Sequence, residues 1–326
     1  MAEPNRPNSH KSTSASSSIS DDSFSSALFP DCDRLSFVKK LSEAKFPVYL
    51  VRDNKTDQLQ AIKIFPWEDD NQPSLFYARE VRFSQFNHPN IISIIDCKTE
   101  QETFCSEGTK VSYVLMEYAK YGDFFDALIT LKIPFKDIHI RTYFHQVLEG
   151  LEVLHNKGAA HLDLKLENLL IDENYTLKLT DFDLSYMPED KVVKTRGTIH
   201  FRAPEVLNNC CLDPQAADIY SLGMMLFIFK TGGMIPYKEE GYYRGVDMKE
   251  LKEFNPKAFW KKQCEFLGKD ASFFSEDFKT LFMWMTQSHP EKRPTIMQIK
   301  RSKWYLDEVC SKEELFVFMN GRFEFL

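Results

Sequence analysis

Residue types that bind divalent cations recur at fixed intervals in one stretch of the chain. Positions His161–Asp172 read HLDLKLENLLID, and Leu177–Ser185 read LKLTDFDLS. Asp163 precedes Asn168 by five positions and Asp181 by eighteen. Asn168 and Asp181 offer the hard oxygen ligands that Mg²⁺ prefers. A purely structural role could explain each residue by itself, with Asp163 as a loop cap and Asp181 as a turn residue. Such roles do not easily explain both residues at this spacing.

The two segments resemble the catalytic loop and the metal-binding motif of eukaryotic protein kinases. The resemblance implies a Ser/Thr protein kinase that transfers the γ-phosphoryl group of ATP to a protein hydroxyl, with Mg²⁺ as cofactor. It assigns Asp163 to the carboxylate near the attacking hydroxyl and Lys165 to neutralising charge on the transferring phosphate. It assigns Asn168 and Asp181 to the metal ions. The wording of both segments is closest to the calmodulin-dependent and AMP-activated kinase branch.

Two segments upstream fit the same resemblance. QAIKIF presents Lys63, which is assigned to the nucleotide, and YAREVRF supplies Glu80 as the ion-pair partner of that lysine. Val48 and Ala61 are assigned to the nucleotide pocket. An isolated lysine or glutamate is ordinarily a surface residue. The order of Lys63 and Glu80 relative to the catalytic segment favours a shared role instead.

The segment VLMEYAKYGDFFD resembles the hinge between the two lobes of a kinase. The resemblance places backbone groups of Glu117 to Ala119 against the adenine base and Asp123 against the ribose. Met116 stands where the family guards the back of the adenine pocket. A plain core methionine is an equally good interpretation of Met116.

Three later segments carry the rest of the resemblance, which spans about 37–305. GTIHFRAPE, which ends at Glu205, resembles the segment that docks protein substrates. DIYSLG resembles the start of the central helix, whose Asp218 braces the catalytic loop, and KRPT supplies Arg293 as the expected partner of Glu205. A buried pair of this kind fixes the segment in place but is weak support for net stability.

The chain departs from the family pattern at the loop that covers the phosphates. The family has GxGxxGxV, whereas Ser42–Val48 reads SEAKFPV, which contains no glycine and is about one residue shorter. Glycines let backbone N–H groups approach phosphate closely, and Pro47 has no N–H to donate. We therefore expect this loop to bind the phosphates weakly.

Two further departures affect the metal-binding motif and the catalytic loop. Asp183 stands where DFG has its glycine, so a second carboxylate lies near Asp181, where it either repels phosphate or holds metal. Leu162 stands where HRD has its arginine, which anchors a phosphorylated activation loop in the family. Without that arginine, this mode of activation is not expected.

The pattern of apolar residues predicts a β lobe followed by a helical lobe. Runs at 48–53 and 58–65, separated by NKTD, predict a hairpin, and 90–95 and 111–118 predict further strands. A helix is expected at about 77–86, and others at 140–154, 217–230, 256–267, 275–287 and 295–302. The expected fold class is α+β: a bilobal, protein-kinase-like fold with a small, mainly antiparallel β lobe and a larger helical lobe.

Domain boundaries follow from composition. Residues 1–33 are serine-rich and too polar to bury a core, so a disordered tail is expected there. The kinase domain is expected at 34–306, with the small lobe at 34–118 and the large lobe at 119–306. The C-terminal extension at 307–326 contains apolar clusters such as LFVFM, which pack on the large lobe or bind a partner. Packing is the favoured interpretation.

Charge and cysteine content argue against several classes of protein. The 326 residues carry a net charge of −7, which argues against a general nucleic-acid binder. Seven scattered cysteines without a CxxC pair fit a reducing compartment. The polar N-terminus is unlike a secretory signal, and the longest apolar run, 222–229, is far too short to span a bilayer. We expect a cytoplasmic protein, with a nuclear location left open, that binds ATP and a protein substrate.

Three functions compete on these observations. An active Ser/Thr protein kinase is favoured because the acid, lysine and metal positions that do chemistry are all present. A pseudokinase that serves as a scaffold, with or without nucleotide, is the main alternative, and the glycine-free loop and Asp183 favour it. A small-molecule phosphotransferase on the same fold fits less well, because GTIHFRAPE would build a peptide-docking surface.

Overall fold

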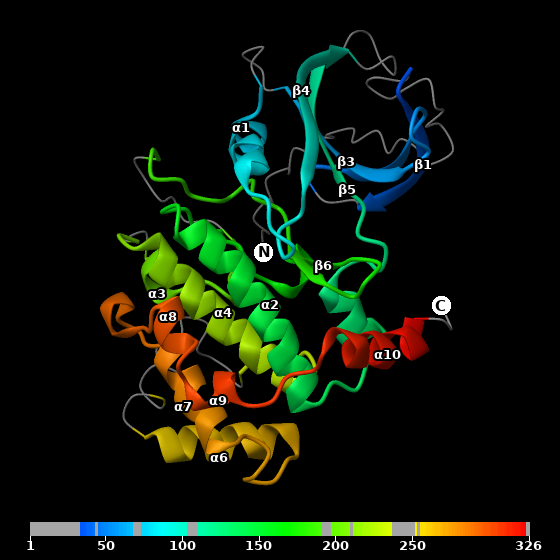
Figure 1. Cartoon of the computed structure of the whole chain (residues 1–326). Helices are drawn as coiled ribbons and strands as arrows, with labels where there is room; N and C mark the ends of the chain where they lie inside the picture. Colours follow the sequence, from blue (N-terminus) through cyan, green and yellow to red (C-terminus); the bar gives the residue numbers. More distant parts are fainter. Residues whose placement is uncertain are drawn as a thin grey trace, which may run out of the picture.

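The structure is a computed structural model that describes residues 33–42, 45–67, 73–102, 110–190, 197–208, 211–236, 252 and 255–323. A β-rich lobe lies above a larger helical lobe in Figure 1. This arrangement confirms the expected α+β bilobal fold. The expected N-terminal tail, 1–33, lies outside the described residues except for its last position.

The small lobe is built on an antiparallel sheet with the strand order β1-β2-β3-β5-β4. β2 and β3 form the predicted hairpin, and Asp53 Oδ1 accepts the N–H groups of Lys55 and Thr56 in the turn that joins them. The strands are β1 (Leu35–Ser42), β2 (Val48–Asp53), β3 (Leu59–Pro66), β4 (Ile94–Glu102) and β5 (Lys110–Glu117).

The two-residue period of a strand decides which side chains of β3 face the interior between the lobes. Ile62 packs into an outer cluster with Tyr49 and Leu115. Ala61 and Phe65 belong instead to the main core, which continues into the large lobe. Lys63 lies between them on the same inner face, so the sheet directs its ammonium group toward the large lobe.

The helix of the small lobe, α1 (Leu75–Arg82), begins at Ser74, whose hydroxyl accepts the N–H of Phe76. A 3₁₀ turn at Phe83–Gln85 continues it, so the helix predicted at about 77–86 is confirmed with shifted ends. In Figure 1, α1 lies beside the sheet and above the large lobe.

The strand predicted at 90–95 is wrong in position, because β4 begins only at Ile94. The preceding residues serve the large lobe instead. The amide of Asn90 donates to the Leu177 carbonyl at 2.8 Å, and the N–H of Leu179 donates to the Asn90 carbonyl at 2.9 Å. These contacts join the two lobes.

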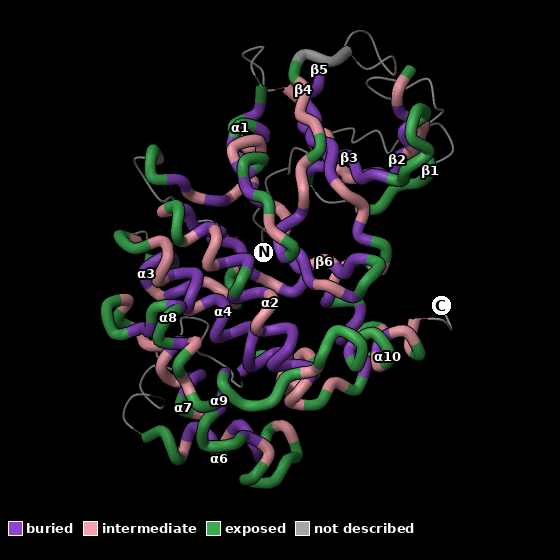
Figure 2. The backbone as a smooth tube through the Cα atoms, in the orientation of Figure 1, coloured by how far each residue is buried: buried purple, intermediate pink, exposed green. Residues whose placement is uncertain are grey.

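The large lobe surrounds α4 (Pro214–Thr231), which is buried on nearly every side, as its continuous apolar sequence predicts (Figure 2). The predicted helix at 295–302 is wrong in extent: α8 (Ile296–Ile299) is one turn, and Ser302 then caps α9. The other elements are α2 (Asp137–His155), β6 (Leu169–Ile171), β7 (Leu177–Leu179), α3 (Pro204–Leu207), α6 (Pro256–Leu267), α7 (Glu276–Met285) and α9 (Lys303–Leu306).

The C-terminal extension folds into α10 (Lys312–Phe323), which packs on the large lobe through buried Leu315 and Met319. Phe323 packs on Tyr121 at 4.7 Å between ring centroids, and Tyr121 stacks in turn on Tyr175. Red α10 thus lies close to the connection between the lobes (Figure 1). Within the described residues, the structure contains no helix long and apolar enough to cross a membrane.

Candidate active site

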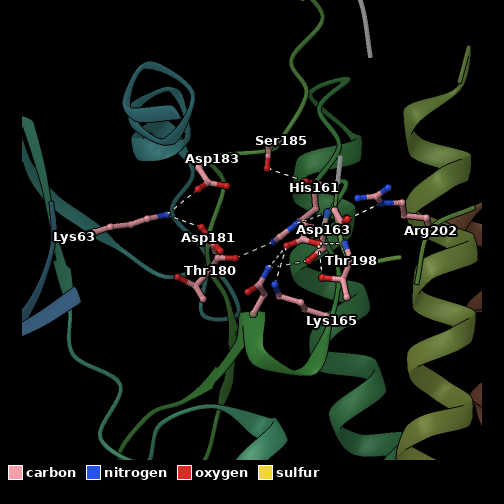
Figure 3. A network of polar contacts seen from close by, with 12 residues as sticks. Lys63, His161, Asp163, Lys165, Thr180, Asp181, Asp183, Ser185, Thr198 and Arg202 are labelled. Carbon is pink, nitrogen blue, oxygen red and sulfur yellow. Dashed lines mark hydrogen bonds and ion pairs between the residues drawn. The ribbon is translucent and has the colours of Figure 1, made fainter. Parts of the chain in front are cut away.

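The Asp163 carboxylate is held from three directions (Figure 3). The N–H of Thr198 donates to Oδ1 at 2.7 Å, and the Thr198 hydroxyl lies 3.2 Å from the same oxygen. Lys165 Nζ lies 3.1 Å from Oδ2, and Asn168 Nδ2 donates to Oδ2 at 3.1 Å. The carboxylate therefore has a fixed orientation and a cation beside it, which suits a group that must align a hydroxyl nucleophile.

The loop that carries Asp163 is braced from beneath by Asp218 of α4. Asp218 Oδ2 accepts the N–H of His161 and Oδ1 accepts the N–H of Leu162, each at 2.8 Å, and His155 Nε2 lies 3.0 Å from Oδ2. Leu162 has a φ of 63°, which a residue with a side chain rarely adopts. The buried Asp218 offsets this strain through charge-assisted hydrogen bonds.

Lys63 joins the two lobes through three carboxylates. Its Nζ lies 3.0 Å from Glu80 Oε2 on α1, 2.5 Å from Asp181 Oδ1 and 3.6 Å from Asp183 Oδ2. Burial alone lowers the pKa of this lysine, but the three carboxylates, Glu80 foremost, raise it above its ordinary value. Lys63 is therefore a permanent cation at the place where the resemblance puts the phosphates.

Asp183, which stands where the family has a glycine, contacts Lys63. Its carboxylate lies within ion-pair distance of Lys63, so its charge is compensated in part by that cation. Burial raises the pKa of Asp183, and Lys63 acts in the opposite direction. Asp183 is therefore an additional ion-pair partner of Lys63, a contact that the sequence did not predict.

The chemistry of Asn168 and Asp181 fits a magnesium site. Asn168 uses its amide nitrogen to hold Asp163, which leaves its amide oxygen as the group suited to a metal. Asp181 has a φ of 68°, and Lys63 opposes the effect of burial to keep the pKa of this carboxylate below its ordinary value. Among the described residues, no group of three or more His, Cys, Asp or Glu side chains forms a metal site. Mg²⁺ is commonly held by one or two protein ligands together with substrate phosphates, so the oxygens of Asn168 and Asp181 would suffice to hold it.

Phe182 connects the metal-binding segment to α1 and to the catalytic loop. Its ring stacks on Phe83, with centroids 4.6 Å apart and planes 4° from parallel, and lies 5.1 Å from the ring of His161. His161 Nε2 also lies 3.0 Å from the Thr180 carbonyl (Figure 3). These stacked rings therefore connect α1, which carries Glu80, to the segment of Asp181 and to the loop of Asp163.

The hinge contains an interaction that the sequence did not predict. The Glu117 side chain accepts the N–H of Ser93 at 2.6 Å and pairs with Lys178 of β7 at 3.0 Å. This side chain is thus turned toward the large lobe, and the backbone N–H of Glu117 donates to the Ser93 carbonyl at 3.0 Å. The sequence feature that could have indicated this pair is Lys178, a lone cation between two leucines in LKL.

The other nucleotide-pocket residues lie around this hinge. Ala61 on β3 pairs with Met116 on β5, and Val48 on β2 pairs with Lys63. Met116 is buried in the core, and Ala119, also buried, lies two residues beyond the end of β5. Asp123 Oδ1 accepts the N–H of Asp126 at 2.9 Å, at the start of the π-helical turn Asp126–Thr130.

The end of the phosphate-covering loop is anchored by an aromatic residue. Phe46 is buried and packs on Phe65 and Phe76, at centroid distances of 4.7 and 5.1 Å. The Pro47 carbonyl accepts the N–H of Ile64 at 3.1 Å. Two residues of the loop, Glu43 and Ala44, lie outside the described residues.

The segment after the catalytic loop is fixed by the predicted partner of Glu205. Arg293 reaches both carboxylate oxygens of Glu205, at 2.5 and 2.7 Å, and donates to the Ala216 carbonyl at 2.8 Å. Both side chains of the pair are buried. Arg202 donates to the Gly197 carbonyl within the same segment, next to Thr198 (Figure 3).

Comparison with known proteins agrees with this geometry. The model of the protein kinase domain family matches residues 43–305. The chain is 32% identical over 282 residues to CBL-interacting protein kinase 26 of Oryza sativa subsp. japonica, covering 84% of this chain and 52% of that protein. It is 34% identical over 203 residues to CBL-interacting serine/threonine-protein kinase 8 of Arabidopsis thaliana, covering 61% of this chain and 42% of that protein.

The fold, the site and these matches define a bilobal protein kinase domain, and the chain belongs to the protein kinase family. The chain spans about half the length of the relatives it matches. Neither the assembled site nor the named relatives favour the scaffold alternative raised by the glycine-free loop.

Proposed function

We propose that this chain is an ATP-dependent protein Ser/Thr kinase. One observation supports the proposal most strongly: two polar networks are formed in the same structure. Lys165, Asn168 and Thr198 all contact the Asp163 carboxylate. Lys63 pairs with both Glu80 and Asp181. A scaffold has no need of an oriented carboxylate with a cation beside it. This arrangement favours phosphoryl transfer over binding alone.

In the proposed reaction, Asp163 orients the Ser or Thr hydroxyl and accepts its proton as the oxygen bonds to the γ-phosphorus. The bond from that phosphorus to the oxygen that bridges it to the β-phosphate breaks, and ADP leaves. Lys165 stabilises the charge on the transferring group, and Lys63 holds the phosphates of ATP. Mg²⁺, held by Asn168 and Asp181, would neutralise phosphate charge. The wording of HLDLKLENLLID and LKLTDFDLS supports assignment to the calmodulin-dependent and AMP-activated kinase branch. The seven scattered cysteines, which fit a reducing compartment, support a cytoplasmic location.

The test is transfer of radiolabelled γ-phosphate from ATP to a mixture of basic proteins, with and without Mg²⁺, followed by phosphoamino-acid analysis. We expect metal-dependent phosphoserine and phosphothreonine. A product dominated by phosphotyrosine would contradict the proposed specificity. ATP binding by calorimetry without any transfer would support the scaffold instead.

A further inference from the structure

The position of α1 decides whether Lys63 and Glu80 meet, because Glu80 lies on this eight-residue helix. An eight-residue helix is too short to be stable by itself, so its place depends on tertiary contacts. One such contact is the stack of Phe83 on Phe182, just beyond the helix end. A polar contact lies beside it on the last turn of the helix.

Arg82, two residues after Glu80, binds Asp190 through both of its terminal nitrogens. Nη1 donates to Oδ1 at 2.8 Å and Nη2 donates to Oδ2 at 2.9 Å. Both side chains are about 70% buried, with 30% and 27% of their surfaces exposed. A bidentate, partly buried pair is the geometry in which an Arg–carboxylate contact contributes most.

Asp190 is itself fixed to the catalytic loop. Its Oδ2 accepts the N–H of Met187 at 3.0 Å, and its N–H donates to the Met187 carbonyl at 2.9 Å, which closes a tight turn. Tyr186, at the start of this turn, exchanges two backbone hydrogen bonds with Ala160, at 2.8 and 3.0 Å. The carboxylate that Arg82 binds is thus connected, through this turn, to the segment that leads into His161.

The surroundings keep Asp190 ionised. Burial raises the pKa of this carboxyl, but Arg82, the Met187 N–H and nearby Arg79 together hold it below its ordinary value. Leu162, which replaces the arginine of the family's HRD, is buried against Ala203 and Val206 and offers no charge to a phosphate. A fixed carboxylate is present here, whereas the usual anchor for a phosphate is missing.

We propose that the Arg82–Asp190 ion pair is a phosphate-independent latch that holds α1 where Glu80 meets Lys63. The inference rests on the proposed kinase activity and specifies how that activity is regulated: the permanent carboxylate of Asp190 takes the place of an added phosphate. Arg82 and Asp190 are positioning residues, since they act through Glu80 and touch no reacting atom. The unphosphorylated chain is then already in the competent arrangement.

The experiment is a double-mutant cycle on phosphatase-treated protein with Arg82→Ala, Asp190→Asn and the double variant. Asn at 190 retains an acceptor for the Met187 N–H and loses the charge. We expect each single variant to lower kcat by about tenfold with little change in the KM for the protein acceptor, because fewer molecules have α1 in place. The double variant falls no further than the singles. Losses that multiply in the double variant would overturn the latch.

Hydrogen exchange of the α1 amides separates the latch from the proposed function. Arg82→Ala is expected to speed exchange in α1, and Arg52→Ala is the matched control, because Arg52 pairs with Asp57 at 2.8 Å on the exposed β2–β3 turn. If Arg82→Ala speeds exchange in α1 but the wild type has no transferase activity, the result would support the latch and contradict the proposed kinase function. Wild-type exchange and wild-type kcat in both Arg82→Ala and Asp190→Asn would reject the latch.

Discussion

The backbone N–H of Thr198 lies 2.7 Å from Asp163 Oδ1, although 35 residues separate the two in sequence. The hydroxyl of Thr198 reaches the same oxygen at 3.2 Å. The proposed catalytic carboxylate is therefore oriented by the segment expected to dock protein substrates. Binding of a substrate and alignment of the carboxylate share one structural element.

This relationship predicts that Thr198→Ala lowers kcat by about tenfold, equivalent to roughly 1.4 kcal/mol in barrier, since one of the hydrogen bonds that orient Asp163 is lost. The KM for ATP should stay the same, because Thr198 contacts no part of the nucleotide in the proposed arrangement. Steady-state kinetics check both values. Thr198→Ser is the control, and it should retain most of the activity through its own hydroxyl.

Asp218→Asn should destabilise the fold by about 3 kcal/mol, since hydrogen bonds to a charged group contribute roughly 1.5–3 kcal/mol each. The new NH₂ group would face a backbone N–H of His161 or Leu162, and two donors cannot bond. Urea unfolding measures the change. The matched control is Asp213→Asn, at the cap of α4, where Asn is an equally good capping residue. Equal losses in the two variants would show that Asp218 has no special bracing role.

ATP binding should be weak for a kinase and should depend on metal, because the sequence before β2 has no glycine to let backbone N–H groups approach the phosphates closely, and Pro47 has no N–H. Pro47→Gly restores one donor, and a hydrogen bond to phosphate of roughly 1.5–3 kcal/mol tightens ATP about tenfold or more. Isothermal calorimetry with ATP, with adenosine and with EDTA checks this. Adenosine, which has no phosphate, should bind both proteins equally. If Pro47→Gly gains no affinity for ATP, the weakness lies elsewhere.

Docking of α10 should weaken in acid. The His139 ring stacks on Phe318 of α10, with centroids 3.6 Å apart, and its Nδ1 accepts the N–H of Lys136 at 3.0 Å. Burial, then Arg322 and Lys136, lower the pKa of His139 below its ordinary 6.5. As pH falls, the unfolded chain therefore takes up the proton first. The stability contributed by His139 is complete above about pH 6.5 and is lost below it.

The variant His139→Gln should reduce this pH dependence. Gln at the third position of a helix still supports a capping box, so the change removes the titration with little loss of local structure. The slope of the unfolding free energy against pH, between about pH 6.5 and 5, should fall by up to about 1.4 kcal/mol per pH unit. Chemical denaturation at a series of pH values measures it. An unchanged slope would assign the dependence to two half-buried histidines whose pKa is also lowered by burial, His88 and His145.

Much of the fold was predictable because local signals agree with tertiary structure. The hairpin of β2 and β3, the buried α4 and the limits of α6 all follow from periodicity and turn residues. The start of β4 was not predictable, because Asn90 is drawn into contact with Leu177, 87 residues away. The spacing of Asp163, Asn168 and Asp181 identified candidates for the site from one short stretch.

The parts of the site that the sequence did not reveal depend on distant, ordinary-looking residues. Arg82 has the sequence context of a solvent-facing helix residue, and its partner Asp190 lies 108 positions later. Lys178 binds the hinge residue Glu117 across 61 positions. Neither pair carries a motif, so only the folded chain brings them together. Such pairs are set by tertiary packing rather than by local propensity.

The most direct test of the account compares wild type with Asp163→Asn in phosphoryl transfer and in ATP binding. Removal of the oriented carboxylate should cost roughly 3–5 kcal/mol in barrier, a fall of about two to four orders of magnitude in turnover. The affinity for ATP with Mg²⁺ should change by less than about twofold, since Lys63, Asn168 and Asp181 remain. Wild-type turnover in Asp163→Asn, or no turnover in a wild type that binds ATP, would contradict the account.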